Sequence, residues 1–348
     1  MLLRQAALTL AIAGTVLAGC DKPPAEVEPR RSAAPSAPNP SASAKADTSA
    51  ADDAAMRVPA PARLVAIGDL HGDLEATRRV LRLAGAIDDK DRWIGGALMV
   101  VQTGDQLDRG DGERAIVDLF DRLVGEAKAA GGAVLALNGN HEVMNVALDF
   151  RYVTEGGFKD FTGVPGANLD DPRLSSLPEA QRARGAAFLP GAPYAKKLAQ
   201  RDMIAIVGDT VFVHGGVLPK HVQYGLARMN REVRAFMNGD AKSPPRIVTS
   251  EDGPIWARRY SAAPDKSDCA VLEEALSAMK VKRMVVGHTV QRDGITPAYD
   301  EKVWRIDVGL ARLYGGKPAA LEIRGDKVRS IGEDTAAAAP SSSAKGGR

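Results

Sequence analysis

Short apolar runs recur along the chain, and most of them stop abruptly at a small polar block. Four runs have the length and composition of buried strands, at residues 64–67, 97–102, 133–137 and 283–286. Two more, 203–207 and 210–213, flank Gly208-Asp209 and predict a hairpin. Further strands are expected at 303–308 and 319–331, the latter turning at Gly325-Asp326.

Helical periodicity fills the intervals between these runs. Residues 113–128 show it best, with an apolar stripe made of Ile116, Leu119, Phe120, Leu123 and Ala127. Residues 219–237 and 267–279 follow the same pattern, and each predicts one helix. Strands that alternate with helices predict an α/β body, here 63–332, whose ligands collect at the carboxyl ends of strands.

The first twenty residues have the pattern of an export signal. Arg4 precedes the apolar stretch 6–16, and Leu17-Ala18-Gly19-Cys20 resembles the lipobox of bacterial lipoproteins. The resemblance implies that 1–19 is a signal peptide and that Cys20 is lipidated, which would hold the protein on a membrane, facing the periplasm, in a bacterial cell envelope. An ordinary secretory signal is the alternative, and Asp21 only hints at which membrane holds the anchor.

Segments 20–62 and 333–348 are rich in Ala and Ser and are expected to be disordered, the first also rich in Pro and serving as a tether. The sequence holds two cysteines, Cys20 and Cys269, so we expect no disulfide framework and no thiolate metal site. With 348 residues, 45% apolar and 26% charged, the chain can bury a single large core. A net charge of +2 without a Lys/Arg stripe argues against nucleic acid as a partner.

The polar blocks that end the strands carry the candidate chemistry. They bring together four of the five histidines with acids, an amide and arginines, in Gly68–Asp73, Gly104–Gly110, Gly139–Glu142, His214–Gly216 and Gly287–Thr289. One such block alone is usually a turn or a packed histidine. Together they supply the mixed carboxylate, imidazole and amide ligands that two divalent ions require for phosphoryl chemistry.

The order of the blocks, from 68 to 289, resembles the phosphoprotein phosphatase branch of the calcineurin-like metallophosphoesterases. Segments 139–145, 253–258 and 285–291 further resemble the Shewanella-like phosphatases. This implies a β-sandwich of two mixed sheets flanked by helices, in a single catalytic domain. The segment Arg305–Leu310 departs from the loop of the eukaryotic serine/threonine phosphatases, which puts serine/threonine specificity in doubt.

The resemblance also implies a role for each matching residue. One divalent ion would be held by Asp69, His71 and Asp105, and the other by Asp105, Asn140, His214 and His288, with Asp105 as the bridge. Ligands of this kind suit Mn, Fe or Zn. His141 would be the general acid, held protonated by Asp108, and Arg109 and Arg258 would grip the phosphate.

Four other residues have a structural alternative to a role in the site. Asp73 suits the cap of a helix that begins at Leu74. Glu142 is expected to orient its neighbours, Arg259 competes with Arg258 for the phosphate, and His221 stands at a helix start where contact with substrate is the lesser expectation. The insertion 143–202 is either a lid or specificity wall, or a peripheral cap.

The sequence therefore predicts a hydrolase that cleaves phosphomonoesters by attack of a metal-bridging hydroxide. Phosphotyrosine in proteins or peptides is the leading substrate class, ahead of small phosphomonoesters. A dinucleoside polyphosphate or pyrophosphate hydrolase is the alternative enzyme. A binding lipoprotein on an inactive phosphatase scaffold is the alternative from another class, and the intact pair His141 and Asp108 argues against it.

Overall fold

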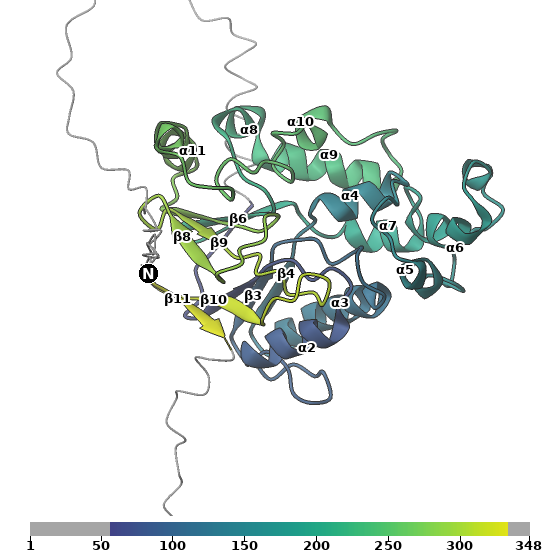
Figure 1. Ribbon diagram of the computed structural model, residues 1–348, viewed down its shortest axis with the longest axis horizontal. Helices are drawn as coiled ribbons and strands as arrows, with labels where there is room; N and C mark the ends of the chain where they lie inside the picture. The colour runs from purple at the N-terminus through teal and green to yellow at the C-terminus, as the bar shows by residue number, and fades with distance from the viewer. Residues whose placement is uncertain (1–55, 333–348) are drawn as a thin grey trace, which may run out of the picture.

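A computed structural model describes residues 56–332, which form two mixed β-sheets packed face to face (Figure 1). One sheet has the strand order β11 (Lys327–Gly332), β10 (Ala319–Arg324), β2 (Leu64–Ile67), β3 (Met99–Gln102), β4 (Ala133–Ala136). The other has the order β1 (Arg57–Val58), β5 (Ile204–Val207), β6 (Thr210–Val213), β7 (Arg283–Val286), β9 (Val303–Arg305), β8 (Thr296–Ala298). The predicted α/β sandwich of two mixed sheets is confirmed.

The inner faces of the sheets share one apolar core, which includes Val101, Phe212, Trp304, Ile306 and Leu321. Helices cover the outer faces. The outer face of the five-stranded sheet lies against α2 (Leu74–Leu83) and α3 (Glu113–Ala129), and that of the six-stranded sheet lies against α8 (Pro219–Tyr224), α9 (Leu226–Asn238) and α11 (Cys269–Met279) (Figure 1). Because β2, β3, β6 and β7 are covered on both faces, they are continuous apolar runs with every residue buried.

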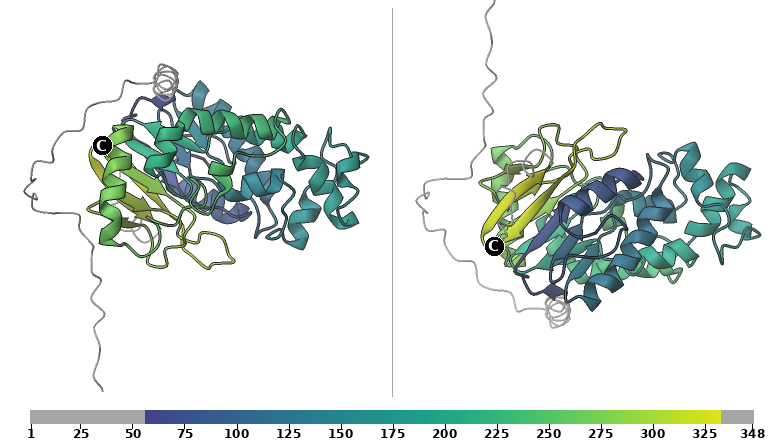
Figure 2. Two further views of the ribbon diagram at one scale, coloured as in Figure 1. Left: turned by 90° about the horizontal axis from the view of Figure 1, so that it is seen from above. Right: turned by 90° about the horizontal axis from the view of Figure 1, so that it is seen from below.

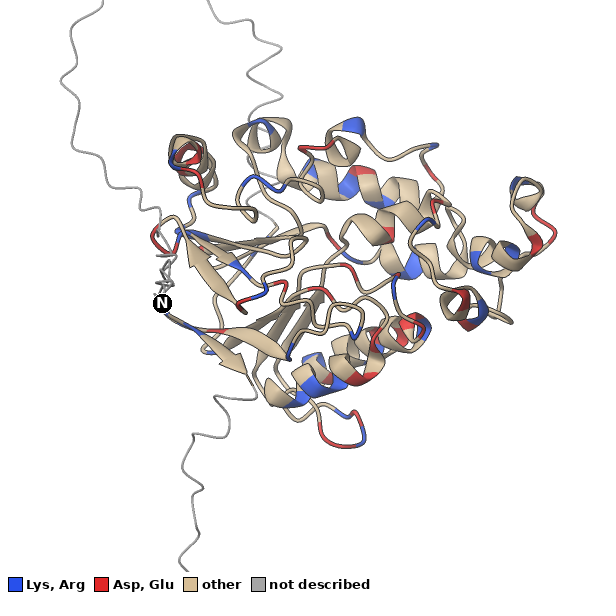
Figure 3. Ribbon diagram, viewed as in Figure 1, with Lys and Arg blue, Asp and Glu red and all other residues tan. Residues whose placement is uncertain are grey.

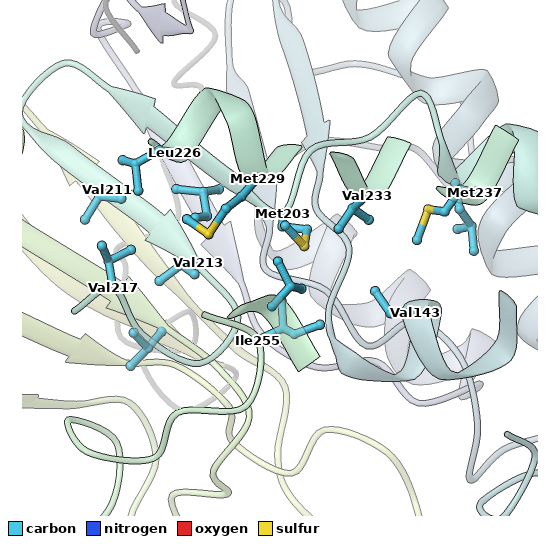
Figure 4. Close-up of a cluster of buried hydrophobic side chains, with 14 of the residues drawn as sticks. Val143, Met203, Val211, Val213, Val217, Leu226, Met229, Val233, Met237 and Ile255 are labelled. Atoms are coloured by element: carbon cyan, nitrogen blue, oxygen red, sulfur yellow. The ribbon is translucent and has the colours of Figure 1, made fainter. Parts of the chain in front are cut away.

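The apolar stripe of α9 packs directly on the six-stranded sheet. Figure 4 shows Leu226 and Met229 of this helix beside Val211 and Val213 of β6, with Val233 farther along the helix. The stripe follows the helical period, so this burial explains why the sequence pattern found the helix. Burying side chains of this size contributes about 1.5–3 kcal/mol each.

The helices between the third and fourth blocks lie at one end of the molecule (Figure 2). They are α4 (Asn140–Val146), α5 (Glu155–Asp160), a 3-10 turn at Pro172–Leu174, α6 (Glu179–Phe188) and α7 (Pro193–Leu198). Aromatic rings pack these helices together and join them to the core of the six-stranded sheet, with the ring of Phe161 centred 4.7 Å from Phe188 and 4.9 Å from Tyr194. These contacts make the insertion a packed unit rather than an open loop.

One sequence expectation about local structure is wrong. The single helix expected over 219–237 is divided into α8 and α9 at Gly225, whose φ of 100° no helix accommodates. The expectation of no disulfide framework involves Cys20, which lies outside the described residues. The signal peptide, the tether before Met56 and the tail 333–348 lie outside them as well.

Charged side chains are interspersed over the described residues. Figure 3 shows acidic and basic positions side by side along the same helices, in agreement with the small net charge. Within residues 56–332, no helix combines the length and apolar character needed to cross a membrane.

Candidate metal centre and active site

The five polar blocks meet at one edge of the sandwich, just beyond the carboxyl ends of β2, β3, β4, β6 and β7. Backbone hydrogen bonds join the blocks to one another. The amides of Leu70 and His71 donate to the carbonyl of Asp105 at 2.9 and 3.0 Å, and the amide of Gly287 donates to the carbonyl of His214 at 2.8 Å. These bonds fix the relative positions of side chains that are far apart in the sequence.

Several site residues have backbone conformations that side chains rarely adopt. His71, Asp105, Asp108, Arg109 and His288 all have φ between 45° and 68°. A non-glycine residue in this region costs on the order of 1–3 kcal/mol and persists only where its surroundings hold it. Such concentration of strain is typical of a functional site.

Two glycines that begin blocks make room for carboxylates. A Cβ at Gly139 would lie 2.3 Å from Oδ1 of Asp105, and a Cβ at Gly287 would lie 2.4 Å from Oδ1 of Asp69. Any larger residue would displace the acid that it touches. The glycines therefore belong to the site although they bring no functional group.

Glu142 holds two blocks together from beneath. Its Oε2 accepts from the amides of Asp105 at 2.8 Å and Gly139 at 2.7 Å, and its Oε1 accepts from Gln106 at 2.8 Å and Leu107 at 3.3 Å. Burial and the nearby Asp105 raise the pKa of Glu142, while the backbone donors oppose this shift. The expectation that Glu142 orients its neighbours agrees with these contacts.

Glu142→Gln should destabilise the fold by about 2–4 kcal/mol, because an amide NH₂ would face backbone N–H groups that lose their acceptor. Chemical denaturation measures the difference. Glu126→Gln is the matched control, since Glu126 accepts from one backbone amide, that of Trp93, at a half-exposed position. Equal stability losses in the two variants would contradict the role assigned to Glu142.

Asp105 is the hub of the candidate metal centre. Its Oδ2 lies 3.1 Å from Nε2 of His214, 3.6 Å from Nε2 of His141 and 3.8 Å from Nε2 of His71. Two groups of buried ligands share this carboxylate, one with His71 and His141 and the other with His214 and His288. A residue common to both groups has the placement required of a bridging ligand.

The remaining predicted ligands complete these groups. Oδ1 of Asn140 and Nδ1 of His288 lie 2.9 and 3.1 Å from Nε2 of His214. Oδ2 of Asp69 lies 3.7 Å from Nε2 of His71. The structure thus brings all six predicted ligands together, with His141 as an additional imidazole beside the first group.

The electrostatics of this cluster fit divalent cations. Burial lowers the pKa of His71 to about 3 and that of His288 to about 2, so both imidazoles are neutral, which is the form that binds metals. Burial and repulsion from Asp307 and Asp105 raise the pKa of Asp69. A bound cation reverses this effect, because its charge offsets the crowded carboxylates. Asp105 raises the pKa of His214 against the effect of burial, and a cation bound to Asp105 would offset this as well. Imidazoles, carboxylates and one amide oxygen form a donor set that suits such ions.

His141 and Asp108 form a buried pair beside the ligands. Nδ1 of His141 lies 2.5 Å from Oδ2 of Asp108. Burial alone would lower the pKa of His141, but Asp105 and Asp108 outweigh burial and raise it. The imidazolium form is therefore favoured, with Nε2 facing the ligand group.

Each of the two predicted phosphate-binding arginines contacts one of the candidate ligands. Nη1 of Arg109 lies 2.9 Å from Nε2 of His71, and its guanidinium stacks 5.1 Å from the ring of Tyr152 and 5.5 Å from that of Tyr314. Arg258 is exposed and donates to the backbone carbonyl of His288 at 2.8 Å. Both can reach a ligand at the cluster.

The residues with structural alternatives separate clearly. Asp73 caps α2 by accepting from the amide of Ala76 at 3.0 Å, which confirms the capping interpretation. Arg259 pairs with Asp268 at 2.6 Å, unlike Arg258. His221 is fully buried, its Nδ1 accepts from the amide of Leu218, and it belongs to neither ligand group.

Sequence reasoning missed five residues that the structure places at or behind the centre, namely Glu113, Tyr152, Arg184, Asp307 and Tyr314. Asp307 lies in the segment Arg305–Leu310, which departs from the loop of the eukaryotic serine/threonine phosphatases, and it is buried beside Asp69 just after β9. Its position after a strand, between apolar residues, was the available signal. The tyrosines had no such signal, because loops bring them in.

Residues 62–292 match the calcineurin-like phosphoesterase family, and the chain belongs to it. The chain is 44% identical over 297 residues to Shewanella-like protein phosphatase 2 of Arabidopsis thaliana, with 76% of each sequence covered. It is 28% identical over 280 residues to Shewanella-like protein phosphatase 1 of Plasmodium berghei, covering 77% of this chain and 74% of the relative. The predicted likeness to the Shewanella-like phosphatases is confirmed.

The fold is shared with the cold-active protein tyrosine phosphatase of a psychrophilic Shewanella species. The two structures have a TM-score of 0.62 at 22% identity, over 79% of this chain and 82% of the other. Family and ligand groups together make this protein a metal-dependent phosphatase, which confirms the predicted class of enzyme.

Proposed function

We propose that the protein hydrolyses phosphotyrosine in proteins or peptides, using Asp69, His71, Asp105, Asn140, His214 and His288 to hold two divalent ions. The observation that carries the proposal is the pair His141 and Asp108, placed beside two ligand groups that share Asp105. When bound, the ions activate water and offset phosphoryl charge. Manganese, iron and zinc all suit the donors.

The protein's own residues then perform the remaining steps. Arg109 and Arg258 hold the phosphoryl oxygens from two sides. As water's oxygen bonds to phosphorus and the bond to the leaving oxygen breaks, Nε2 of His141 gives its proton to that leaving oxygen. Water's own proton restores His141, which gives free phosphate and a phenol or alcohol without a covalent phosphoenzyme.

Aromatic side chains beside the centre support a phosphotyrosine substrate. The ring of Tyr152 is centred 5.1 Å from that of His141, and the ring of Trp256 is centred 5.9 Å from that of His288. The phenyl ring of a phosphotyrosine would gain stabilisation from packing against these aromatic rings, beyond the area that it buries. The relatives named as Shewanella-like protein phosphatases and as a protein tyrosine phosphatase support the same substrate class.

A cleft of about 930 Å³ leads from His71 and Arg109 along the start of α2. The insertion supplies one wall of it through Thr154, Glu155 and Lys159. We propose that this wall contacts the peptide that surrounds the phosphorylated residue. Of the two interpretations of the insertion, the cleft favours the specificity wall.

A substrate panel tests the proposal. The full chain should show at least tenfold higher kcat/KM on a phosphotyrosine peptide than on the matched phosphoserine peptide and on a dinucleoside tetraphosphate. Equal rates on the two peptides would leave a general phosphomonoesterase. A tenfold preference for the tetraphosphate would replace the proposal by the dinucleoside polyphosphate hydrolase.

We also propose that Cys20 is lipidated and holds the protein on a membrane facing the periplasm. The motif Leu17-Ala18-Gly19-Cys20 supports this, because its small residues precede cysteine as lipoprotein processing requires. A single acyl chain binds a membrane only weakly, whereas several chains on the same cysteine would attach the protein firmly.

Cys20→Ser should abolish incorporation of labelled fatty acid and move the protein from the membrane fraction to the soluble fraction. A chain that begins at Met56 should be soluble and active, because residues 56–332 contain both sheets and the core between them. Cys269→Ser is the matched control and should leave the lipid label in place. Intact mass is the second readout: a Cys20 thiol found in a disulfide with Cys269, and no lipid, would contradict the anchor.

A further inference from the structure

The largest fully buried side chain in the described residues is a charged one, Arg184. It lies on α6, inside the insertion between the third and fourth blocks. Its guanidinium is packed against the rings of Phe161 and Phe188, at 4.8 and 5.1 Å from their centroids. Burial of an arginine is costly unless its charge and all its donors are matched, so its partners decide its purpose.

Every donor of Arg184 is used, and the partners lead to the catalytic pair. Nε donates to Oδ1 of Asn145 at 2.8 Å, and Nη1 donates to Oε1 of Glu113 and to the carbonyl of Gly157, both at 2.9 Å. Nη2 donates to Oε2 of Glu113 at 2.5 Å and to Oδ1 of Asp108 at 3.2 Å. Asp108 is the residue whose other oxygen contacts His141.

Asp108 is thereby held by two donors at Oδ1 and by one acceptor at its backbone amide. Asn145 donates to Oδ1 at 2.9 Å alongside Arg184, and the backbone amide of Asp108 donates to Oε2 of Glu113 at 2.9 Å. With Oδ1 occupied by these donors, Oδ2 is left to face Nδ1 of His141. A planar guanidinium that bridges Glu113 and Asp108 fixes this orientation in a way that a point charge cannot.

We infer that Arg184 is a positioning residue for leaving-group protonation, acting from the insertion through Asp108 on His141. The inference rests on the proposed function, in which His141 is the general acid. It also gives the insertion a second purpose: α6 supplies a cation that completes the buried network, so the segment is part of the catalytic framework.

Arg184→Met tests the inference, because methionine keeps a side chain of similar length but removes the guanidinium group and its hydrogen bonds. With phenyl phosphate, whose leaving group needs a proton, kcat should fall by roughly 10–100-fold, a part of the 10²–10⁴-fold that a general acid contributes. With p-nitrophenyl phosphate, the loss should be at least fivefold smaller. KM and the two metal equivalents should stay within about twofold of the parent values.

Arg201→Met is the matched control. Arg201 is buried in the same insertion and binds Gln106 and Asp121 at 2.9 and 2.8 Å, without contact to Asp108. Arg201→Met should change kcat on phenyl phosphate and on p-nitrophenyl phosphate by the same factor. If Arg184→Met does not fold, Arg184→Lys replaces it, since lysine keeps the positive charge but cannot bind two acceptors in a bidentate way. Its loss of kcat should be smaller and should depend on the leaving group in the same way.

The double variant with His141→Asn separates this inference from the proposed function. If Arg184 acts through His141, adding Arg184→Met to His141→Asn should cost less than twofold more on phenyl phosphate. Equal losses on both substrates, or fully additive losses in the double variant, would overturn the role of Arg184. If His141→Asn alone showed no leaving-group dependence, the assignment of the acid itself would fail.

Discussion

Asp105→Asn is expected to lower phosphatase turnover by at least about 10³-fold and to reduce bound metal at the same time, because one carboxylate serves both ligand groups. Oδ2 of Asp105 faces three imidazoles within 3.8 Å, and its Oδ1 accepts from the backbone amide of His141 at 3.0 Å. The amide of asparagine cannot supply two anionic oxygens. Metal analysis and turnover on an aryl phosphate measure the two effects together.

Asp202→Asn is the control for Asp105→Asn. Asp202 pairs with Arg234 at 2.8 Å and lies outside the ligand groups. Metal content and turnover should both be retained in that variant. Near-normal turnover with two metal equivalents in Asp105→Asn would remove the bridge from the account.

His141→Asn should keep both metal equivalents and lose roughly 10²–10⁴-fold in turnover on substrates with poor leaving groups. The ring lies beside the first ligand group, so geometry alone permits it to be a ligand. Its Nδ1 is taken by Asp108, the contact that a ring held as a proton donor requires. The rate loss should shrink on aryl phosphates with good leaving groups.

Loss of one metal equivalent in His141→Asn would assign the residue to the ligands instead. Equal rate losses on good and poor leaving groups would show that it does not donate the proton. Asn145→Ala is a useful companion variant, since Asn145 lies on α4 with His141 and donates to Asp108. It should give a smaller loss with the same leaving-group dependence.

The clustering of the six candidate ligands could be predicted from the sequence because each follows the end of a strand within a few residues. The apolar runs before the blocks match β2 and β7 residue for residue, and β3 and β4 within a few residues. Once parallel strands are assumed, their carboxyl ends must meet. The position of Asn140 needed one more fact, that a helix begins at that residue and turns its side chain toward His214.

The support behind the site could not be predicted in the same way. Arg184 and Glu113 are 71 residues apart, and their contact exists only because α6 packs its apolar face on Phe161 while turning one arginine inward. Periodicity does not show which charged residue of a helix is buried. Likewise, Tyr152 and Tyr314 reach Arg109 from irregular loops, which have no period to detect.

The division of the expected helix at Gly225 shows that apolar periodicity does not reveal where one helix ends and the next begins. The apolar spacing of α8 and α9 continues almost in phase, so the pattern predicted one helix where a single glycine turns the chain. Glycine inside a helical pattern is tolerated often enough that its presence alone does not mark a break.

The stoichiometry of metal activation shows whether turnover requires two divalent ions bound at the ligand groups that share Asp105. The full chain, stripped with a chelator and titrated with Mn²⁺, should bind two equivalents per chain, and turnover on a phosphotyrosine peptide should appear in proportion to the doubly loaded form. Full turnover of the stripped protein, or full turnover at one equivalent, would contradict a phosphatase built on two ligand groups that share Asp105.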